Sequence, residues 1–479
     1  MSHLPKPKTG LIGLGVMGRN LALNLLNHQV PLAVYSYAQR ECDDFAASLE
    51  SAALQGTAEV TNSLTNFVAS LDRPRTILMM VTAGDAVDSV INDLLPHLSA
   101  GDILIDGGNS HYKDTMRREV MLKERSLNFI GTGISGGEEG ARNGASLMVG
   151  GSLNAFEIAK PVFAALSTEA KGEPCFGHVG SDGAGHFVKM VHNGIEYGVM
   201  QLIAESYHFK KHQLGESNQE IAETYAEWNQ RKLRSYLLEI TAEIFKQQDT
   251  EADGDLIDVI SDRAGQKGTG RWTVDAAMEL GVPVPGIAAA VTERQISALS
   301  SIRQATKSFA IETVSVDKTN QNVWNHKLEN ALYASVLLMY VQGLSLIQSA
   351  SEEYDWQTDL SQVIRLWRGG CIIRAEMLES LVSAAQEKHP LHLVLTRILQ
   401  GELQPCIQDW REVVAASILN GSPLPAMAGS LNYLCSLHTA HLPLNLVQAQ
   451  RDYFGAHSYE RRDKPGVFHT EWTSADTDG

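Results

Sequence analysis

Cysteine is scarce in this chain, with five residues among 479. None of the five forms a CxxC pair or stands at metal-ligand spacing from histidines, and an odd number of scattered cysteines does not indicate a disulfide framework. We therefore expect free thiols, a reducing compartment and no zinc site.

Positive charge and long apolar runs are also lacking. Lys and Arg number 39 against 56 Asp and Glu, a net charge of -17, which disfavours a general affinity for nucleic acid or anionic membranes. No apolar run reaches the roughly 18 residues of a spanning helix, and the first residues lead directly into a predicted strand without a signal-peptide hydrophobic region. We expect a cytoplasmic protein in which an anionic ligand needs a local basic pocket.

The remaining composition, 44% hydrophobic and 20% charged residues, is typical of a soluble globular protein with room for two or three domains. Strand and loop patterns fill the chain to about residue 183, and long helical patterns follow to about residue 440. We expect a dinucleotide-binding Rossmann-like α/β domain over 1–183, a large all-α domain over 184–440, and a tail over 441–479.

Gly13, Gly15 and Gly18 form the spacing GxGxxG between a short apolar strand and a helical run over 19–27. Glycines there allow a tight turn and let the backbone approach a pyrophosphate at the helix N-terminus. Alone the spacing is weak and also suits a turn chosen for packing. A second predicted strand over 32–35 strengthens the dinucleotide interpretation.

The tip of this second strand bears on the adenosine ribose. An NAD site normally has an acid there for the ribose hydroxyls, and an NADP site has a base for the extra phosphate. Here the tip reads Ser36-Tyr37-Ala38-Gln39-Arg40, so the acid is absent and the nearest base is displaced. The pattern modestly favours NADP and does not exclude NAD.

Four further apolar runs, over 76–81, 103–106, 128–131 and 146–150, are candidates for parallel strands. The ligand crevice of an open parallel sheet lies at the carboxyl ends of its strands, where the first three runs end in small or polar residues. Each of these residues alone also suits a turn. Those that we expect to meet a ligand are Asn109, Ser135, Gly136 and Gly137.

The stretch 185–207 has two faces at helical spacing. Apolar residues recur at steps of three and four, which predicts a helix with the stripe Val188, Val191, Ile195, Val199 and Leu202. Another side of the helix carries five polar residues at the same spacing: Lys189, His192, Asn193, Glu196 and Tyr197. Together they supply a base, an imidazole, an amide, an acid and a phenol, which are sufficient for proton transfers on a small polar molecule. A solvated surface would explain them equally. Gly194 and Gly198 favour instead the close approach of a backbone or ligand.

Three later features are suggestive. The segment 265–272, with Lys267, is too glycine-rich for a helix and suits either an anion or a plain surface loop. The tail 450–472 carries aromatic residues and paired charges that predict packing on a partner subunit. Met339-Tyr340-Val341 with Trp367 echoes the sequence 196–198 with Trp228, which indicates a duplicated helical unit.

Seven ordered segments resemble the decarboxylating 6-phosphogluconate dehydrogenases of the pentose phosphate pathway, and the similarity runs from Gly10 to Trp472. They read GLGVMGRNLALN, DGGNSHYKDT, ISGGEEGARNGASLM, KMVHNGIEYG, QKGTGRWT, RGGCIIR and QAQRDYFGAHSYERRDKPGVFHTEW. The resemblance implies a Rossmann-like coenzyme domain, an all-helical domain with a duplicated unit, and a homodimer in which a C-terminal arm crosses into the other subunit.

The resemblance also implies oxidation of 6-phospho-D-gluconate to D-ribulose 5-phosphate and CO2 without a metal. Lys189 matches the base that takes the C3 hydroxyl proton and later returns it, and Glu196 matches the acid that protonates C1 of the enediol. Lys189 must then be neutral, so its pKa should be lowered. The sugar acid would be held by Asn109, Ser135, Gly136, Gly137, His192 and Asn193, and its phosphate end by Tyr197, Lys267 and the partner's Arg451 and His457.

Along the coenzyme the family pattern is incomplete. Tyr37 stands where NADP-dependent members carry an arginine, and Thr82 where many carry a lysine; we hypothesise that Arg40 compensates. Ser297 stands at the family's phosphate-binding arginine, and Arg294, one helical turn earlier, is the candidate replacement. Residues matched to coenzyme binding are Gly13, Gly15, Val16, Met17, Gly18, Ser36, Tyr37, Arg40, Val81, Thr82, Ala83 and Asn109.

Three alternatives stay open. The Tyr37 and Thr82 departures would suit an NAD-preferring version of the same reaction. A β-hydroxyacid dehydrogenase for a small unphosphorylated acid would share the glycine-rich start and Lys189, although such enzymes are shorter. A catalytically silent dinucleotide-binding homologue would tolerate the departures, but the intact group on the predicted helix favours an enzyme.

Overall fold

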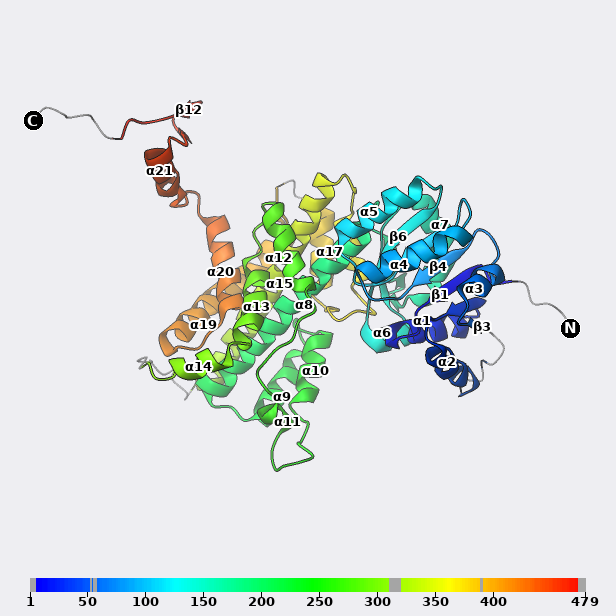
Figure 1. Cartoon of the computed structure of the whole chain (residues 1–479). Helices are drawn as coiled ribbons and strands as arrows, with labels where there is room; N and C mark the ends of the chain where they lie inside the picture. Colours follow the sequence, from blue (N-terminus) through cyan, green and yellow to red (C-terminus); the bar gives the residue numbers. More distant parts are fainter. Residues whose placement is uncertain (1–5, 52–53, 55–57, 310–319, 388–390, 473–479) are drawn as a thin grey trace, which may run out of the picture. The chain divides into compact units, whose positions relative to one another are not determined.

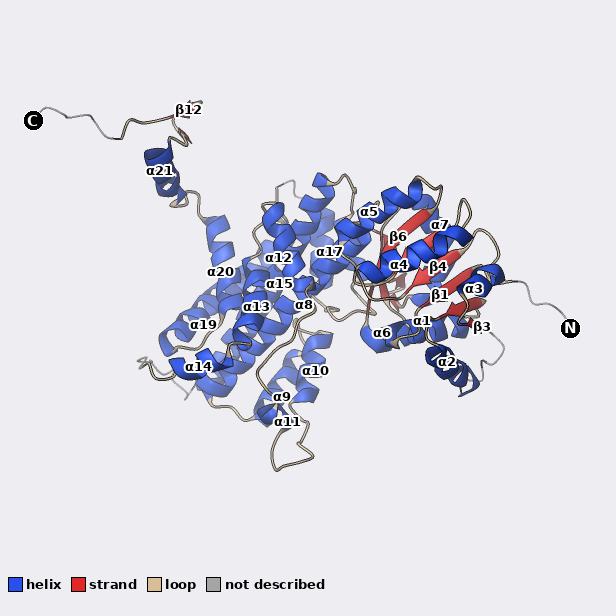
Figure 2. Ribbon diagram, viewed as in Figure 1, coloured by secondary structure: helices blue, strands red, loops and turns tan. Residues whose placement is uncertain are grey.

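The computed structural model describes residues 6–51, 54, 58–309, 320–387 and 391–472. The chain divides into two compact units, which meet in sequence between Ser430 and Leu431. The first unit contains a sheet covered by helices, followed by a large array of helices (Figures 1 and 2). The expected Rossmann-like domain and the all-helical domain after it are both present.

The sheet has the strand order β10-β7-β6-β5-β4-β1-β2-β3. Its strands are β1 (Thr9–Ile12), β2 (Leu32–Tyr35), β3 (Ala58–Thr61), β4 (Thr76–Met79), β5 (Ile103–Asp106), β6 (Asn128–Ser135), β7 (Ser146–Val149) and β10 (Phe176–His178). The strands from β3 to β6 in this order run parallel, as expected for all of them except β3, which the sequence pattern did not predict.

The expectation that β7 is parallel to its neighbour β6 is wrong. β6 continues past Gly131 to Ser135, and this extension pairs antiparallel with β7, Ser135 opposite Ser146. The connection between them holds only the short helix α6 (Gly137–Asn143), and a connection so short favours antiparallel pairing. Ser135 therefore lies on a strand rather than in a turn.

Helices cover both faces of the sheet, because side chains alternate along each strand. Leu11 packs into one buried cluster with α1 (Val16–Asn27), α2 (Gln39–Ser51) and α7 (Leu153–Leu166). Its neighbour Ile12 packs into the other, with α3 (Leu64–Ser70), α4 (Asp85–Leu94) and α5 (Tyr112–Lys123).

The helical part begins with α8 (Ala184–His208), which confirms the helix expected over 185–207 and continues into a π-helical turn, Phe209–Leu214. The helices that follow are α9 (Asn218–Trp228), α10 (Tyr236–Ile244), α11 (Leu256–Val259), α12 (Thr269–Glu279), α13 (Pro285–Ser297), α14 (Ser300–Thr306), α15 (Gln321–Glu353), α16 (Leu360–Leu366), α17 (Leu378–Glu387), α18 (Arg397–Leu403), α19 (Ile407–Asn420) and α20 (Pro425–His438).

α8 lies in the middle of this part and packs against α12, α13, α15 and β6. Its whole apolar stripe is buried. A Cβ on Gly194 would meet the Thr273 side chain of α12 at 2.6 Å, and one on Gly198 would collide with Met339 of α15. The two glycines thus admit neighbouring helices and not a ligand. The long helices α8 and α15 pack side by side, while the duplication itself stays a prediction.

Among the described residues, α15 is the one helix long and apolar enough to cross a membrane by length and composition. Its most apolar stretch of 18 residues has a mean hydropathy of 1.4. In the structure 89% of that stretch is buried, as in the core helix of a soluble protein.

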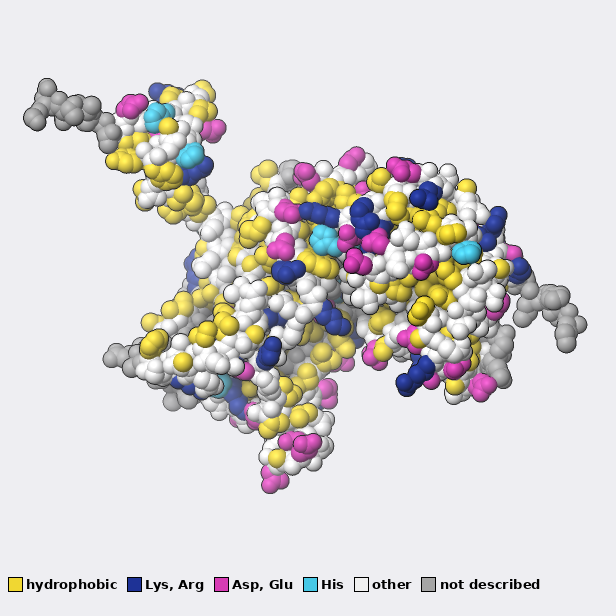
Figure 3. All heavy atoms as spheres, viewed as in Figure 1, with side chains coloured by type: hydrophobic (Ala, Val, Ile, Leu, Met, Phe, Trp, Pro, Cys, Tyr) yellow, Lys and Arg dark blue, Asp and Glu magenta, His cyan; other side chains and the backbone are white. Residues whose placement is uncertain are grey.

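The C-terminal unit contains α21 (Leu444–Gly455) and a small hairpin of β11 (Tyr459–Glu460) and β12 (Val467–Phe468). Asp452, fully buried, holds this unit together: its carboxylate accepts hydrogen bonds from Ser458 N at 2.8 Å, His469 Nδ1 at 2.9 Å and Trp472 Nε1 at 2.8 Å. Hydrophobic side chains lie on the surface of the unit (Figure 3).

Candidate active site

The turn after β1 has the geometry that the glycine spacing predicts. Gly13 has φ +97°, and a Cβ there would meet the Met80 carbonyl oxygen at 2.5 Å. α1 begins directly after Gly15, which caps the helix N-terminus without a side-chain hydrogen bond. A Cβ added to Gly15 would have no other atom within 4 Å, so the space beside it is open. The first amides of α1 therefore face an open region rather than a side chain.

A cavity of about 970 Å³ extends from this turn to α8. It brings together most of the residues that the sequence singled out from distant segments. Predicted residues that line it are Gly15, Val16, Met17, Gly18, Val81, Thr82, Ala83, Asn109, Ser135, Gly136, Gly137, Lys189, Asn193, Glu196, Tyr197 and Lys267.

The polar face of α8 forms one wall of the cavity. Lys189 Nζ lies 3.4 Å from His192 Nδ1, and His192 Nδ1 lies 3.2 Å from Asn193 Oδ1. His192 Nε2 lies 3.2 Å from Ser135 Oγ on β6. His192 is fully buried and stands behind the lining residues, so it orients Lys189, Asn193 and Ser135 toward the cavity.

Burial shifts the charges of this group toward neutral forms. The pKa of Lys189 is lowered by burial, against the opposing effect of Glu196. The pKa of Glu196 is raised by burial, although Lys189 and Arg294 oppose the shift. The pKa of His192 falls well below its usual value because of burial and of Lys189. The lowered pKa expected for Lys189 is confirmed, and an amine beside a carboxylic acid can exchange protons in both directions.

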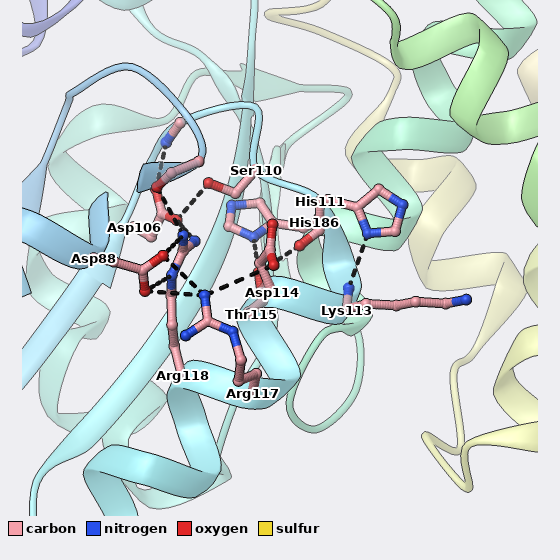
Figure 4. A network of polar contacts seen from close by, with 12 residues as sticks. Asp88, Asp106, Ser110, His111, Lys113, Asp114, Thr115, Arg117, Arg118 and His186 are labelled. Atoms are coloured by element: carbon pink, nitrogen blue, oxygen red, sulfur yellow. Dashed lines mark hydrogen bonds and ion pairs between the residues drawn. The ribbon is translucent and has the colours of Figure 1, made fainter. Parts of the chain in front are cut away.

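A polar network supports the loop that carries Asn109 (Figure 4). Asp106 ends β5 and accepts hydrogen bonds from Gly108 N at 3.0 Å and from Ser110 Oγ at 2.6 Å, so it holds both sides of Asn109. Arg118 on α5, fully buried, lies 3.5 Å from Asp106 and donates to the carboxylate of Asp88 on α4.

The segment 265–272 is only partly a loop. Gly268, with φ +97°, precedes α12, which begins at Thr269, so the expectation that glycine would exclude a helix is wrong for the second half. Its remaining loop borders the cavity through Lys267. The α12 N-terminus forms here because Gly268 adopts a left-handed conformation and lets the chain turn into the helix.

Arg294 on α13 approaches the same end of the cavity. Its guanidinium stacks 3.5 Å above the centre of the Tyr197 ring and donates to the Gly265 carbonyl at 3.0 Å. Ser297, one turn further, donates to the Arg294 carbonyl oxygen and accepts from Ala264 N. Arg294 therefore lies beside Tyr197 and Glu196, although it does not line the cavity itself.

A second cavity of about 510 Å³ lies at the tips of β1, β2 and β4 and shares Gly15, Met80, Val81 and Thr82 with the first. Ser36 and Tyr37 line it as expected. Arg40 does not; its side chain is 92% exposed and pairs with Asp44 at 3.8 Å. The conclusion that the tip has no acid is wrong, because Glu41 lines this cavity and accepts a hydrogen bond from Ser36 Oγ.

Arg451 and His457 belong to the C-terminal unit. Arg451 donates to Gln448 Oε1 at 3.0 Å, and the His457 ring packs against Phe454 at 6.0 Å. Their expected role at a partner's site stays a prediction. Among the described residues, no group of three or more His, Cys, Asp or Glu could hold a metal ion.

Sequence reasoning missed several lining residues, namely Glu41, Met80, Thr269, Trp272 and Ile372. Trp272 and Ile372 stand within segments that were singled out for their resemblance, but no local pattern distinguishes them. The position of Glu41 could have been predicted from its spacing. Glu41 follows Ser36 by five residues and stands in the first turn of α2, so the start of the helix brings it back to the tip of β2.

Two family models match the chain: "NAD binding domain of 6-phosphogluconate dehydrogenase" over residues 8–180 and "6-phosphogluconate dehydrogenase, C-terminal domain" over residues 185–472. The NADP(+)-dependent, decarboxylating 6-phosphogluconate dehydrogenase of Bacillus subtilis is 46% identical, covering 98% of this chain and 100% of its own. The decarboxylating enzyme of Haemophilus influenzae is 45% identical, covering 98% and 97%.

A solved structure agrees with these sequences. The 6-phosphogluconate dehydrogenase of Plasmodium falciparum, described in its apo form and in complex with NADP+ and with 6-phosphogluconate, superposes with a TM-score of 0.94. It is 39% identical and covers 97% of this chain and 100% of its own.

Proposed function

The chain belongs to the 6-phosphogluconate dehydrogenase family, and on that premise we propose that it converts 6-phospho-D-gluconate to D-ribulose 5-phosphate and CO2 with NADP as the oxidant. The observation that carries the proposal is the wall formed by α8. Lys189, with its lowered pKa, faces the same cavity as Glu196 and the glycine-rich turn. The coenzyme and substrate are those in the names of the relatives.

The first amides of α1 and the open space at Gly15 fit the pyrophosphate of a dinucleotide, because a helix N-terminus favours an anion. When bound, the nicotinamide supplies an acceptor for the hydride from C3 of the substrate. The residues that would hold the dinucleotide are Gly13, Gly15, Val16, Met17, Gly18, Ser36, Tyr37, Val81, Thr82, Ala83 and Asn109.

Lys189 would act first as a base. As a neutral amine it takes the proton of the C3 hydroxyl while C3 is oxidised to a ketone. Lys189, now an ammonium, returns that proton to the C3 carbonyl oxygen as the neighbouring carboxylate leaves as CO2, which forms an enediol. Burial supports both states of the cycle, since it brings the lysine pKa closer to neutrality.

Glu196 would act last as an acid. Its raised pKa favours the protonated carboxylic acid, which can deliver a proton to C1 of the enediol and form ribulose 5-phosphate. The carboxylate that remains lies 3.9 Å from His192 Nδ1 at its nearest oxygen.

The sugar acid would contact the cavity wall between β5, β6 and α8 through Asn109, Ser135, Gly136, Gly137 and Asn193, whereas His192, expected to bind it too, would act from behind this wall. Its phosphate end would lie toward Tyr197, Lys267 and Arg294, a group with two cations in a protein whose net charge is -17. A cluster of cations in one pocket is what a phosphate dianion requires.

We also propose a cytoplasmic homodimer in which the C-terminal unit contributes Arg451 and His457 to the site of the other subunit. Exposed aromatic side chains on α21, Tyr453 and Phe454, support packing of this unit on another chain. Domain boundaries near 183 and 440 stay part of the proposal; the break between the family matches, between 180 and 185, supports the first.

The proposal is tested by following absorbance of the reduced nicotinamide with 6-phosphogluconate and NADP, with NAD in parallel and released CO2 trapped. We expect reduced coenzyme and CO2 in equal amounts. 3-Hydroxyisobutyrate, a small unphosphorylated acid, serves as the control and should give neither. Absence of reduction with both coenzymes would contradict the proposal and favour a catalytically silent homologue.

Arg40 is the proposed cation for the 2′-phosphate of NADP. It lies on the first turn of α2 and its weak pair with Asp44 leaves it free to turn. Arg40→Ala should raise the KM for NADP about two- to fivefold, the effect of losing about 0.5–1 kcal/mol from an exposed ion pair. An unchanged KM would show that Arg40 does not compensate for Tyr37.

Arg294 is the proposed replacement for the phosphate-binding arginine. Arg294→Ala should raise the KM for 6-phosphogluconate by about 10- to 100-fold, because hydrogen bonds to charged groups contribute about 1.5–3 kcal/mol. Arg303→Ala is the matched control: Arg303 pairs with Asp262 and donates to the Ser297 carbonyl but does not touch Tyr197. If both variants keep the normal KM, the phosphate depends on Lys267 and Arg451 instead.

A further inference from the structure

The second cavity, beyond the pyrophosphate turn, has an unusual charge. It is lined by the tips of β1, β2 and β4, where the adenosine half of a dinucleotide would lie. Its lining residues include two carboxylates, Glu41 and Asp93, and none of those described is a lysine, arginine or histidine. The pKa of Tyr35 in its wall is raised by burial and then by Asp93, in agreement with a negative surface.

Glu41 is positioned rather than loosely exposed. It stands in the first turn of α2 and lines the cavity, and its carboxylate accepts the hydrogen of Ser36 Oγ at the tip of β2. Ser36 is itself buried. A carboxylate has several acceptor positions, so Glu41 can accept a further hydrogen bond from a ligand hydroxyl while it keeps the one from Ser36.

The arginines near this helix point to other partners. Arg40 pairs with Asp44, and Arg19 donates to the Asp44 carbonyl oxygen at 3.3 Å and to the Ser48 hydroxyl. A phosphate on the ribose would thus lie beside the Glu41 carboxylate, which already lines the cavity, and would gain a cation only if Arg40 turned away from Asp44. A 2′-hydroxyl, by contrast, could donate to it.

We propose that Glu41 makes the adenosine end of this site accept a ribose 2′-hydroxyl, so that the protein takes NAD as well as NADP, with Glu41 as the residue that lowers selectivity for the phosphorylated coenzyme. This inference rests on the proposed function, because it assumes a dinucleotide in the joined cavities. It adds a specificity-determining residue that the sequence pattern at the strand tip did not reveal.

The test is calorimetric titration of the protein with NAD and with NADP, without substrate. We expect the two Kd values to lie within about tenfold of each other. Glu41→Gln keeps the shape but removes the charge, and should shift the ratio of the two Kd values about tenfold in favour of NADP, because one carboxylate–phosphate repulsion is removed and one hydroxyl acceptor is weakened. Asp43→Asn is the matched control, since Asp43 lies on the same helix, outside the cavity, and bonds Gln39 at 2.7 Å. It should leave the ratio unchanged.

A wild-type preference for NADP greater than about tenfold would overturn the inference, and so would an unchanged ratio in Glu41→Gln or an equal shift in Asp43→Asn. The wild-type comparison needs no variant, so a poorly folded Glu41→Gln does not prevent the test. Binding is measured apart from turnover: if both dinucleotides bind with similar Kd values and Glu41→Gln shifts their ratio, but 6-phosphogluconate is not oxidised, the proposed function fails and the inference about Glu41 holds.

Discussion

Lys189→Met should lower kcat for oxidation of 6-phosphogluconate by about 1000-fold, the size expected when a positioned general base is removed. Methionine keeps the length and apolar stem of the side chain but has no proton acceptor. The contacts of Lys189 with the cavity and with His192 make it the group on α8 best placed for this role. Initial rates at saturating substrate and coenzyme measure the effect.

The same substitution should not destabilise the protein. Burial lowers the pKa of Lys189, so the unfolded chain binds this proton more tightly than the folded one. The free-energy cost of burying the charged lysine therefore falls as pH rises from the pKa of the folded state to that of the unfolded state. Methionine removes that cost. We expect an equal or higher Tm, with unchanged coenzyme binding.

Lys160→Met, at an exposed lysine on α7 that pairs with Glu157, is the control and should keep full activity. Activity above about a tenth of wild type in Lys189→Met would exclude Lys189 as the general base.

Arg118→Met should lower the free energy of unfolding by about 3–5 kcal/mol, the effect of leaving a buried charge without its partner. Asp106 is fully buried, and Arg118 is the cation beside it at 3.5 Å. Because Asp106 holds the loop on both sides of Asn109, the KM for substrate should rise as well. Urea denaturation and initial rates measure the two effects.

Arg117→Met is the matched control on the same helix. Arg117 also binds Asp88, at 2.8 Å, but its side chain is 53% exposed, so its loss should cost no more than about 1 kcal/mol. Arg118, and to a lesser extent Arg117, hold the pKa of Asp88 below its usual value. The stability that these ion pairs contribute is therefore fully present above the pKa of Asp88 in the unfolded chain, and it is lost as pH falls through the pKa of Asp88 in the folded protein. Equal effects of the two substitutions would show that burial of Arg118 has no special importance.

The pattern of the sequence was sufficient wherever the determining contacts are local. The glycine spacing predicted the turn after β1, because a tight turn with positive φ at Gly13 depends on few residues. Helical periodicity predicted α8 and its two faces, because side chains at steps of three and four share a side whatever the rest of the chain does. The family was evident for the same reason: its motifs are short and occur in order.

Tertiary structure decided which of these pieces meet and in what state. The lowered pKa of Lys189 depends on burial by segments far away in sequence, and no spacing on α8 contains that information. The direction of β7 depends on a pairing with the end of β6 that the apolar runs did not mark. Glu41 enters the site only because α2 turns it back to Ser36. Charge and pairing across the fold are long-range properties, and they set what the cavity can bind, whereas local pattern determined the elements that build it.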